Sequence, residues 1–199
     1  STNVDATYDL ENIEISNRFY SNENGAAFYA CKTVTIDGSS KDVTLRRPFA
    51  QLNIATTVES LTTDAGNVKI IGAKIKVENV ASSFNTVIGF GEGSTTIYGQ
   101  PSSYVTVDPQ GLTKVIAVNG TDYAKLEVGG ESYVYVTMDY LPIISSDSDT
   151  DPKDLVNINL LIDTDQPTDI EHNFHSVPVQ RNYRTNIVGN LISSTTDFN

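Results

Sequence analysis

Two groups of side chains in the sequence have the residue types that bind metal ions. Glu171, His172 and His175 could supply three ligands to a transition metal. Two histidines three residues apart on a strand or turn do not converge as an i, i+4 pair on a helix does, so a polar loop is the favoured interpretation. The second group consists of four aspartates, Asp147, Asp149, Asp151 and Asp154.

These aspartates lie in the segment SSDSDTDPKD and offer the hard oxygen ligands that calcium prefers. An EF-hand loop also needs a glycine at its turn position and a glutamate that closes it, and the segment has neither. Two interpretations stay open: a weak calcium site and a solvated acidic loop.

The sequence contains no recognisable catalytic motif. A Gly-x-Ser-x-Gly nucleophile motif is absent. The glycine-rich stretch GFGEGS, residues 89–94, is followed by TTIYG, which has the pattern of a strand. A phosphate-binding loop needs a helix N-terminus behind it instead. We therefore predict a protein that is not an enzyme and has no cofactor, with calcium at the aspartates as the alternative.

A basic pair precedes a proline at the point where the apolar alternation changes phase. Arg46 and Arg47 come directly before Pro48. The apolar residues of the first phase are Val43, Leu45 and Phe49, and those of the second phase are Ala50, Leu52 and Ile54. This predicts a β-bulge at which one strand passes from one sheet to another. The arginine pair is either a solvated sheet edge or a protease-accessible site.

The composition limits the class of protein to which these residues can belong. Of 199 residues, 25 are acidic and 13 are basic, which gives a net charge of −12. Nucleic acids and anionic membranes bind clustered Lys and Arg, so neither is an expected partner. A single cysteine, Cys31, excludes an internal disulfide. No long apolar run is present, so no membrane-spanning helix is predicted.

Alternating apolar and polar residues predict about ten strands. They include residues 28–36, 73–77, 105–107, 116–118, 126–128, 134–138 and 156–162. At most one short helix is expected near Val58 to Asp64. The predicted fold of residues 1–199 is an all-β, antiparallel Greek-key β-sandwich with little helix, and a sub-boundary near 80–100 is an option.

The last predicted strand is long and runs from Val177 to Leu191. The residues of its buried face are Val177, Val179, Tyr183, Thr185, Ile187 and Leu191. Arg181 interrupts this face, so we expect its stem to lie along the core and its guanidinium to reach a carbonyl or carboxylate. We expect the strand to pair within its own domain and to close it, rather than to cross a groove in a neighbour.

Three segments resemble recurring segments of the fimbrillin-type surface proteins of gut and oral Gram-negative bacteria. They are VTLRRPFAQLNIATT, KIIGAKIKVENV and VPVQRNYRTNIVGNLIS, in that order along the chain. The resemblance implies a transthyretin-like sandwich that serves as a structural or adhesion subunit of a pilus or pilus-like assembly. It also implies an extracellular location at the outer membrane, and other pilus or surface-protein subunits as partners. In that family a trypsin-like protease removes an N-terminal strand, and a strand from another subunit fills the groove.

A glycan-binding module is the alternative function. The chain has ten tyrosines and no tryptophan, and Tyr133 and Tyr135 share one face of a predicted strand. Tyrosine combines a flat apolar ring with a polar hydroxyl, which suits sugar binding, although tyrosines are also common cross-strand partners on sandwich surfaces. The partner in this case is a host or bacterial surface glycan or protein.

Overall fold

The computed structural model describes residues 9, 12–14, 27–62, 68–87, 89–98, 105–106, 114–144, 153–192 and 196–198. The strands are β1 (Ile13–Glu14), β2 (Phe49–Thr57), β3 (Ile70–Val80), β4 (Ser83–Asn85), β5 (Phe90–Glu92), β6 (Thr95–Tyr98), β7 (Val105–Thr106), β8 (Val115–Val118), β9 (Thr121–Val128), β10 (Glu131–Pro142), β11 (Asp154–Thr164), β12 (Ile170–Val179), β13 (Arg184–Gly189) and β14 (Thr196–Phe198). A 3-10 turn at Glu59–Leu61 lies inside the predicted helical region. The prediction of an all-β sandwich with little helix is confirmed.

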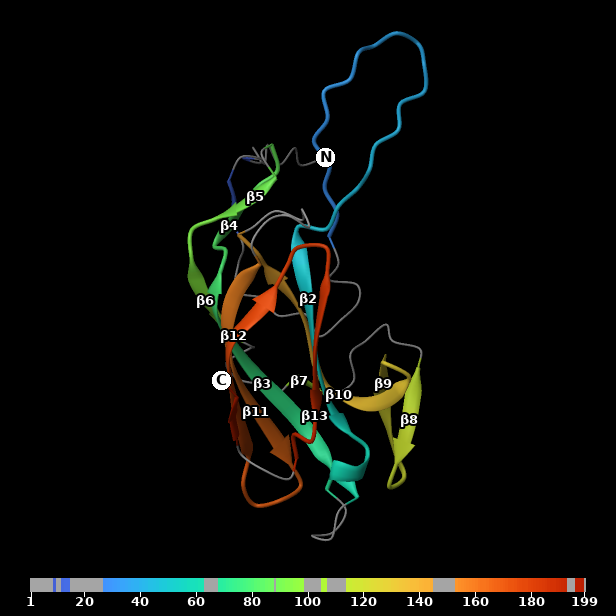
Figure 1. The fold of residues 1–199 in the computed structure, drawn as a ribbon, viewed down its shortest axis with the longest axis vertical. Helices are drawn as coiled ribbons and strands as arrows, with labels where there is room; N and C mark the ends of the chain where they lie inside the picture. Colours follow the sequence, from blue (N-terminus) through green and yellow to red (C-terminus); the bar gives the residue numbers. More distant parts are fainter. Residues whose placement is uncertain are drawn as a thin grey trace, which may run out of the picture.

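The strands form three sheets (Figure 1). A five-stranded sheet has the order β13-β2-β10-β9-β8, and a six-stranded sheet has the order β14-β12-β11-β3-β6, with β7 beside β3. A small sheet, β1-β4-β5, completes the fold. Two pairings, β13 with β2 and β14 with β12, are parallel, and the other strand pairings of the described residues are antiparallel.

The core lies between the two large sheets, as the alternation predicts for two of the strands. On β3, Ala73, Ile75 and Val77 are buried, while the lysines between them are half-buried. On β11, Val156, Ile158, Leu160 and Ile162 are buried at every second position. These side chains pack against Leu52 and Ile54 of β2 and Val134 of β10 in one cluster. Each of these strands contributes one apolar face to the core of the sandwich.

The prediction of one strand that changes its buried face near Pro48 is wrong. Strand β2 begins at Phe49, and before it only Tyr29 and Arg46 form an isolated bridge. Val43 and Leu45 are exposed rather than buried. The predicted strand over 28–36 is not formed either, because within the described part of the chain its backbone has no strand beside it. Alternation alone does not produce a strand where no neighbouring strand completes the ladder.

The predicted single closing strand is two strands in different sheets. Strand β12 ends at Val179 beside β11, and β13 starts at Arg184 beside β2. The chain turns between them, with Asn182 in the left-handed region at φ 66°. The turn is attached to β2 by a bond from the Asn182 N–H to the Phe49 carbonyl (3.0 Å). Both halves pair within the domain, but they do not share one face.

Strand β10 places a carboxyl group inside the sandwich. Asp139 pairs with Leu52 of β2 and is fully buried. Its Oδ2 accepts a hydrogen bond from the Thr137 hydroxyl (2.9 Å), while its Oδ1 has no hydrogen-bond partner among the described residues. Burial raises the pKa of Asp139 to about 8, against a smaller opposing effect of the Thr137 bond. The group is therefore mostly protonated at neutral pH.

No helix in the described part of the chain is long and apolar enough to cross a membrane.

Candidate interaction site at the base of an exposed arm

An extended arm, residues 27–47, leaves one end of the sandwich as an open loop (Figure 1). Every residue from 30 to 46 is exposed. The arm nevertheless carries five large apolar side chains, Phe28, Val34, Ile36, Val43 and Leu45. Ile36 is 98% exposed. Isolated exposed apolar residues are ordinary, but five on one projecting segment make the arm the candidate interaction site of the described residues.

The tip of the arm is a tight turn stabilised by local charges. Asp37 accepts hydrogen bonds from the Ser39 N–H (3.0 Å) and from the Lys41 ammonium (2.8 Å). Lys41, followed by Ser39, lowers the pKa of Asp37 to about 2. Gly38 supplies the left-handed conformation at φ 78°. Below the tip, the Lys32 ammonium donates to the Asp42 carbonyl (2.7 Å) and connects the two legs of the arm.

The base of the arm is anchored through aromatic and cationic contacts. Tyr29 and Arg46 exchange two backbone hydrogen bonds of 2.9 Å each. The Tyr29 ring packs edge-on against Phe84 of β4, with centroids 4.9 Å apart. The guanidinium of Arg181 lies over the same Phe84 ring and also donates a hydrogen bond to the Gly89 carbonyl. Three segments, the arm, the β4–β5 hairpin and the β12–β13 turn, therefore meet at Phe84.

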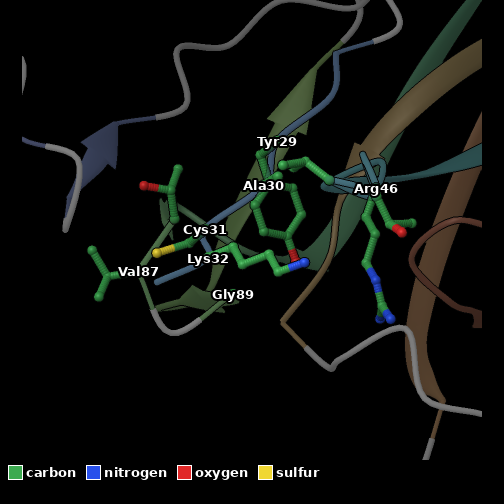
Figure 2. A pocket seen from close by; sticks show the side chains of 10 residues that line it. Tyr29, Ala30, Cys31, Lys32, Arg46, Val87 and Gly89 are labelled. Atoms are coloured by element: carbon green, nitrogen blue, oxygen red, sulfur yellow. The ribbon is translucent and has the colours of Figure 1, made fainter. Parts of the chain in front are cut away.

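A hollow of about 350 Å³ lies beside this base (Figure 2). Its lining residues come from both legs of the arm and from the β4–β5 hairpin: Tyr29, Ala30, Cys31, Lys32, Val43, Thr44, Arg46, Thr86, Val87 and Gly89. The Cys31 thiol is exposed. Lys32 and Arg46 make the lining basic on a chain with an acidic balance.

The candidate protease site lies at the junction of the arm with the sandwich. Arg46 is exposed, Arg47 is half-buried and Pro48 is buried. The Arg47 guanidinium lies over the Phe28 ring, with Cζ 5.2 Å from the centroid. Neither arginine belongs to a strand, so the edge-strand interpretation of the pair does not apply. Cleavage here would leave β2 intact, since β2 begins at Phe49.

Of the four aspartates proposed to bind calcium, only Asp154 lies within the described residues; Asp147, Asp149 and Asp151 lie outside them. Asp154 starts β11, and its Oδ2 accepts a hydrogen bond from the Ile144 N–H (2.7 Å). This bond holds together the two ends of the acidic loop. Among the described residues, no three His, Cys, Asp or Glu side chains are placed to hold a metal ion.

The residues of the predicted closing strand have different roles. Val179 and Leu191 are buried in the core, and Ile187 packs against it from β13. Val177 is half-buried, and Tyr183 is exposed at the turn. Arg181 is 1% exposed, and its guanidinium does reach a carbonyl oxygen, that of Gly89.

The two histidines do not converge on one site. His172 is fully buried, and its Nε2 lies 2.7 Å from the Leu191 carbonyl oxygen. His175 is exposed on the surface of β12. Tyr135 is also buried and packs against Met138, so its ring does not form the sugar-stacking surface that the sequence suggested.

A second hollow, of about 370 Å³, lies on the outer face of the six-stranded sheet. It is lined by Lys76, Glu78, Asn157, Ile158, Asn159, Asn173, Phe174 and His175. The Asn159 amide donates to Asn173 (2.8 Å), and Lys76 pairs with Glu78 (2.5 Å). The bond from Lys76 is the main reason that the pKa of Glu78 is lowered. Amides, a carboxylate and an imidazole together offer donors and acceptors for a polar ligand.

The family model of DUF6562, a family of unknown function, matches residues 5–199. The chain belongs to this family. No curated protein matches the chain. Among solved structures, a proposed cell adhesion protein from Bacteroides fragilis is similar to it at 10% sequence identity and a TM-score of 0.37. That match covers 78% of this chain and 45% of the other, so the chain spans less than half the length of that protein.

Several residues of this DUF6562 site were not singled out from the sequence. Tyr29 and Phe84 lie in segments with no motif, and Gly89 begins the glycine-rich stretch that the sequence presented only as a candidate phosphate-binding loop. Only the fold brings them together around Arg181. Asp139 did leave a signal, because a carboxylate within the apolar run of a strand indicates a buried polar group.

Proposed function

We propose that this DUF6562 protein is a non-enzymatic structural and adhesion subunit on the cell surface, within a pilus or pilus-like assembly. The observation that supports this most is the arrangement of the segments that resemble fimbrillin-type proteins. The first segment contains β2 and the third contains β13, and these strands pair in parallel from Gln51 with Arg184 to Thr56 with Gly189. The resemblance therefore falls on one structural unit rather than on scattered surface positions.

The second segment contributes to the same unit from the facing sheet. It contains β3, whose Ile75 and Val77 share the central cluster with Leu52 of β2 and Val179 at the end of β12. The exposed arm enters this unit directly at Phe49. A rigid sandwich that carries one projecting, apolar segment is suited to joining chains together.

Intact cells that carry the chain test this proposal. Antibodies against the sandwich should label unpermeabilised cells, and deletion of the gene should lower adherence to a surface or to other cells. A cytoplasmic protein that stays unlabelled is the control for cell integrity. Labelling only after permeabilisation, or unchanged adherence after deletion, contradicts the proposal.

Glycan binding is the second candidate, and the hollow on the six-stranded sheet favours it. Asn159 and Asn173 present amides beside Glu78 and His175, and such groups pair with sugar hydroxyls. Binding to a glycan array should weaken in Asn159→Ala and Asn173→Ala. The exposed amide of Gln166, in the β11–β12 loop, supplies the matched control Gln166→Ala. Equal signals from all three variants contradict a site in this hollow.

A further inference from the structure

We propose that the arm of one copy pairs with the free edge of β8 in a second copy, so that copies join head to tail. This inference names the contact within the proposed assembly and rests on that proposed function for its biological setting. The contact itself is a property of the purified chain, and it can be tested without cells.

The arm's backbone supplies the first argument. Between Tyr29 and Arg46, both legs of the arm lie outside the strands, and among the described residues they make no backbone–backbone hydrogen bonds beyond the pair at the base. Side chains bond two of their backbone groups, the Asp42 carbonyl and the Ser39 N–H. Backbone donors and acceptors that no strand pairs with are groups that a strand of another chain can bond. The segment Thr33–Ile36 also has high β propensity, with two β-branched apolar residues alternating with threonines.

The arm's side chains supply the second argument. Val34 and Ile36 lie two positions apart, so they share one face of an extended segment. Both are exposed, and Val43 and Leu45 repeat this pattern on the returning leg. Pairing with an edge strand would cover one of these apolar faces and would satisfy the backbone at the same time.

Strand β8 is the acceptor that fits best. It ends the five-stranded sheet and pairs only with β9 among the described residues, so its other edge is open there. It reads Val-Ile-Ala-Val, four residues that match the length of Thr33–Ile36. Val115 is 58% exposed, and Ala117 is exposed on the same face. Strand β13 forms the opposite edge of the five-stranded sheet, and it is less accessible than β8 because Val188 and Gly189 are half-buried.

Charge and position favour a second copy as the partner. Between Lys32 and Arg47 the chain has four basic and two acidic residues, whereas the whole chain has a net charge of −12. A basic segment is therefore attracted to the acidic body of another copy. The arm projects from one end of the molecule, and the β8–β9 hairpin lies toward the other end (Figure 1). A contact between opposite ends is heterologous, and repetition of it gives an open chain or a ring rather than a two-fold dimer.

Sedimentation velocity of the purified full chain over a range of concentrations tests the contact. We expect concentration-dependent association that Val34→Asp with Ile36→Asp weakens by at least about tenfold in dissociation constant. Leu155→Asp, at an exposed apolar position on β11, is the matched control and should associate like the parent. Unchanged melting temperatures show that all the variants stay folded. A monomeric parent at every concentration, or equal association of the arm variant, overturns the proposal.

Disulfide trapping gives a second test that does not depend on loss of binding. Cys31→Ser removes the single native cysteine. In that background Val34→Cys with Ala117→Cys should form an intermolecular disulfide under mild oxidation, because an antiparallel match of residues 33–36 with residues 115–118 sets Val34 opposite Ala117. Leu155→Cys in place of Ala117→Cys is the control and should cross-link far less. Equal cross-linking of the two variants overturns the choice of β8. Failure of these tests leaves cell-surface labelling and adherence unaffected, so the two proposals fail separately.

Discussion

The guanidinium carbon of Arg181 lies 5.4 Å from the centroid of the Phe84 ring, and this contact joins the β12–β13 turn to the β4–β5 hairpin. A buried guanidinium that is hydrogen-bonded and stacked on a ring is costly to remove, because its partners lose their contacts and a cavity remains. We expect Arg181→Ala to lower the free energy of unfolding by about 2–4 kcal/mol in urea titrations. Arg184→Ala, at an exposed position of β13, should change it by less than about 0.5 kcal/mol. Equal losses of unfolding free energy in the two variants contradict a stabilising role for the contact between Arg181 and Phe84.

We expect a side chain at Gly89 to destabilise the protein more than a side chain at Gly38, although the two glycines have the same backbone conformation. Gly89 and Gly38 have φ of 76° and 78°, so an alanine at either position is strained by about 1–2 kcal/mol. A Cβ at Gly89 would also lie 3.0 Å from the Tyr29 hydroxyl, whereas one at Gly38 meets no atom within 4 Å. Gly89→Ala should therefore have the lower melting temperature. If Gly38→Ala is equally destabilised, Tyr29 is not fixed at the arm base.

We expect the buried carboxyl group of Asp139 to make the protein less stable as the pH rises. The pKa of Asp139 is about 8 in the folded state and near 4 in an unfolded chain, so the folded state binds more protons between these values. The contribution of Asp139 is complete below pH 4 and decreases by up to about 1.4 kcal/mol per pH unit until about pH 8. Urea titrations at pH 5, 6.5 and 8 should show this decrease.

Asp139→Asn serves as the control for this pH dependence. The amide keeps the shape of the carboxyl group and does not ionise, so the pH slope should flatten and the variant should gain stability relative to the parent at pH 8. An unchanged slope would assign the pH dependence to other groups.

Limited proteolysis should begin in the arm. Trypsin needs an extended and accessible segment, and Lys32, Lys41 and Arg46 lie on exposed backbone outside the strands. Lys74 and Lys125 lie within strands and should be cut much later. Mass spectrometry of early fragments should find first cuts between residues 32 and 47, with the sandwich from β2 onward kept intact. First cuts at Lys74 or Lys125 contradict this order.

Alternation in the sequence predicts correctly those strands that bury one face in the core between the two large sheets. Ala73 to Val77 and Val156 to Ile162 were predicted correctly, because the sandwich buries one side of each strand. Val34 and Ile36 have the same pattern and are exposed, since a strand also needs a neighbour that the pattern does not reveal.

The candidate site was less predictable than the fold. Arg181 stood out as a charge among apolar positions, and the structure buries it. Its partners Phe84 and Gly89 are about 90 or more residues away in sequence, and no local pattern connects them. The turn at Asn182 was missed because the alternation continues through it, although the two halves belong to different sheets.

The parallel pairing of β13 with β2 also determines when the protein can fold. Residues 184–189 lie beside residues 51–56, so β2, a central strand of its sheet, lacks one neighbour until almost the whole chain is available. Contacts between segments so distant in sequence slow folding, because a long loop must close before they form. A growing chain therefore cannot complete the five-stranded sheet until residues 184–189 have been synthesised, about 130 residues after the strand that they pair with.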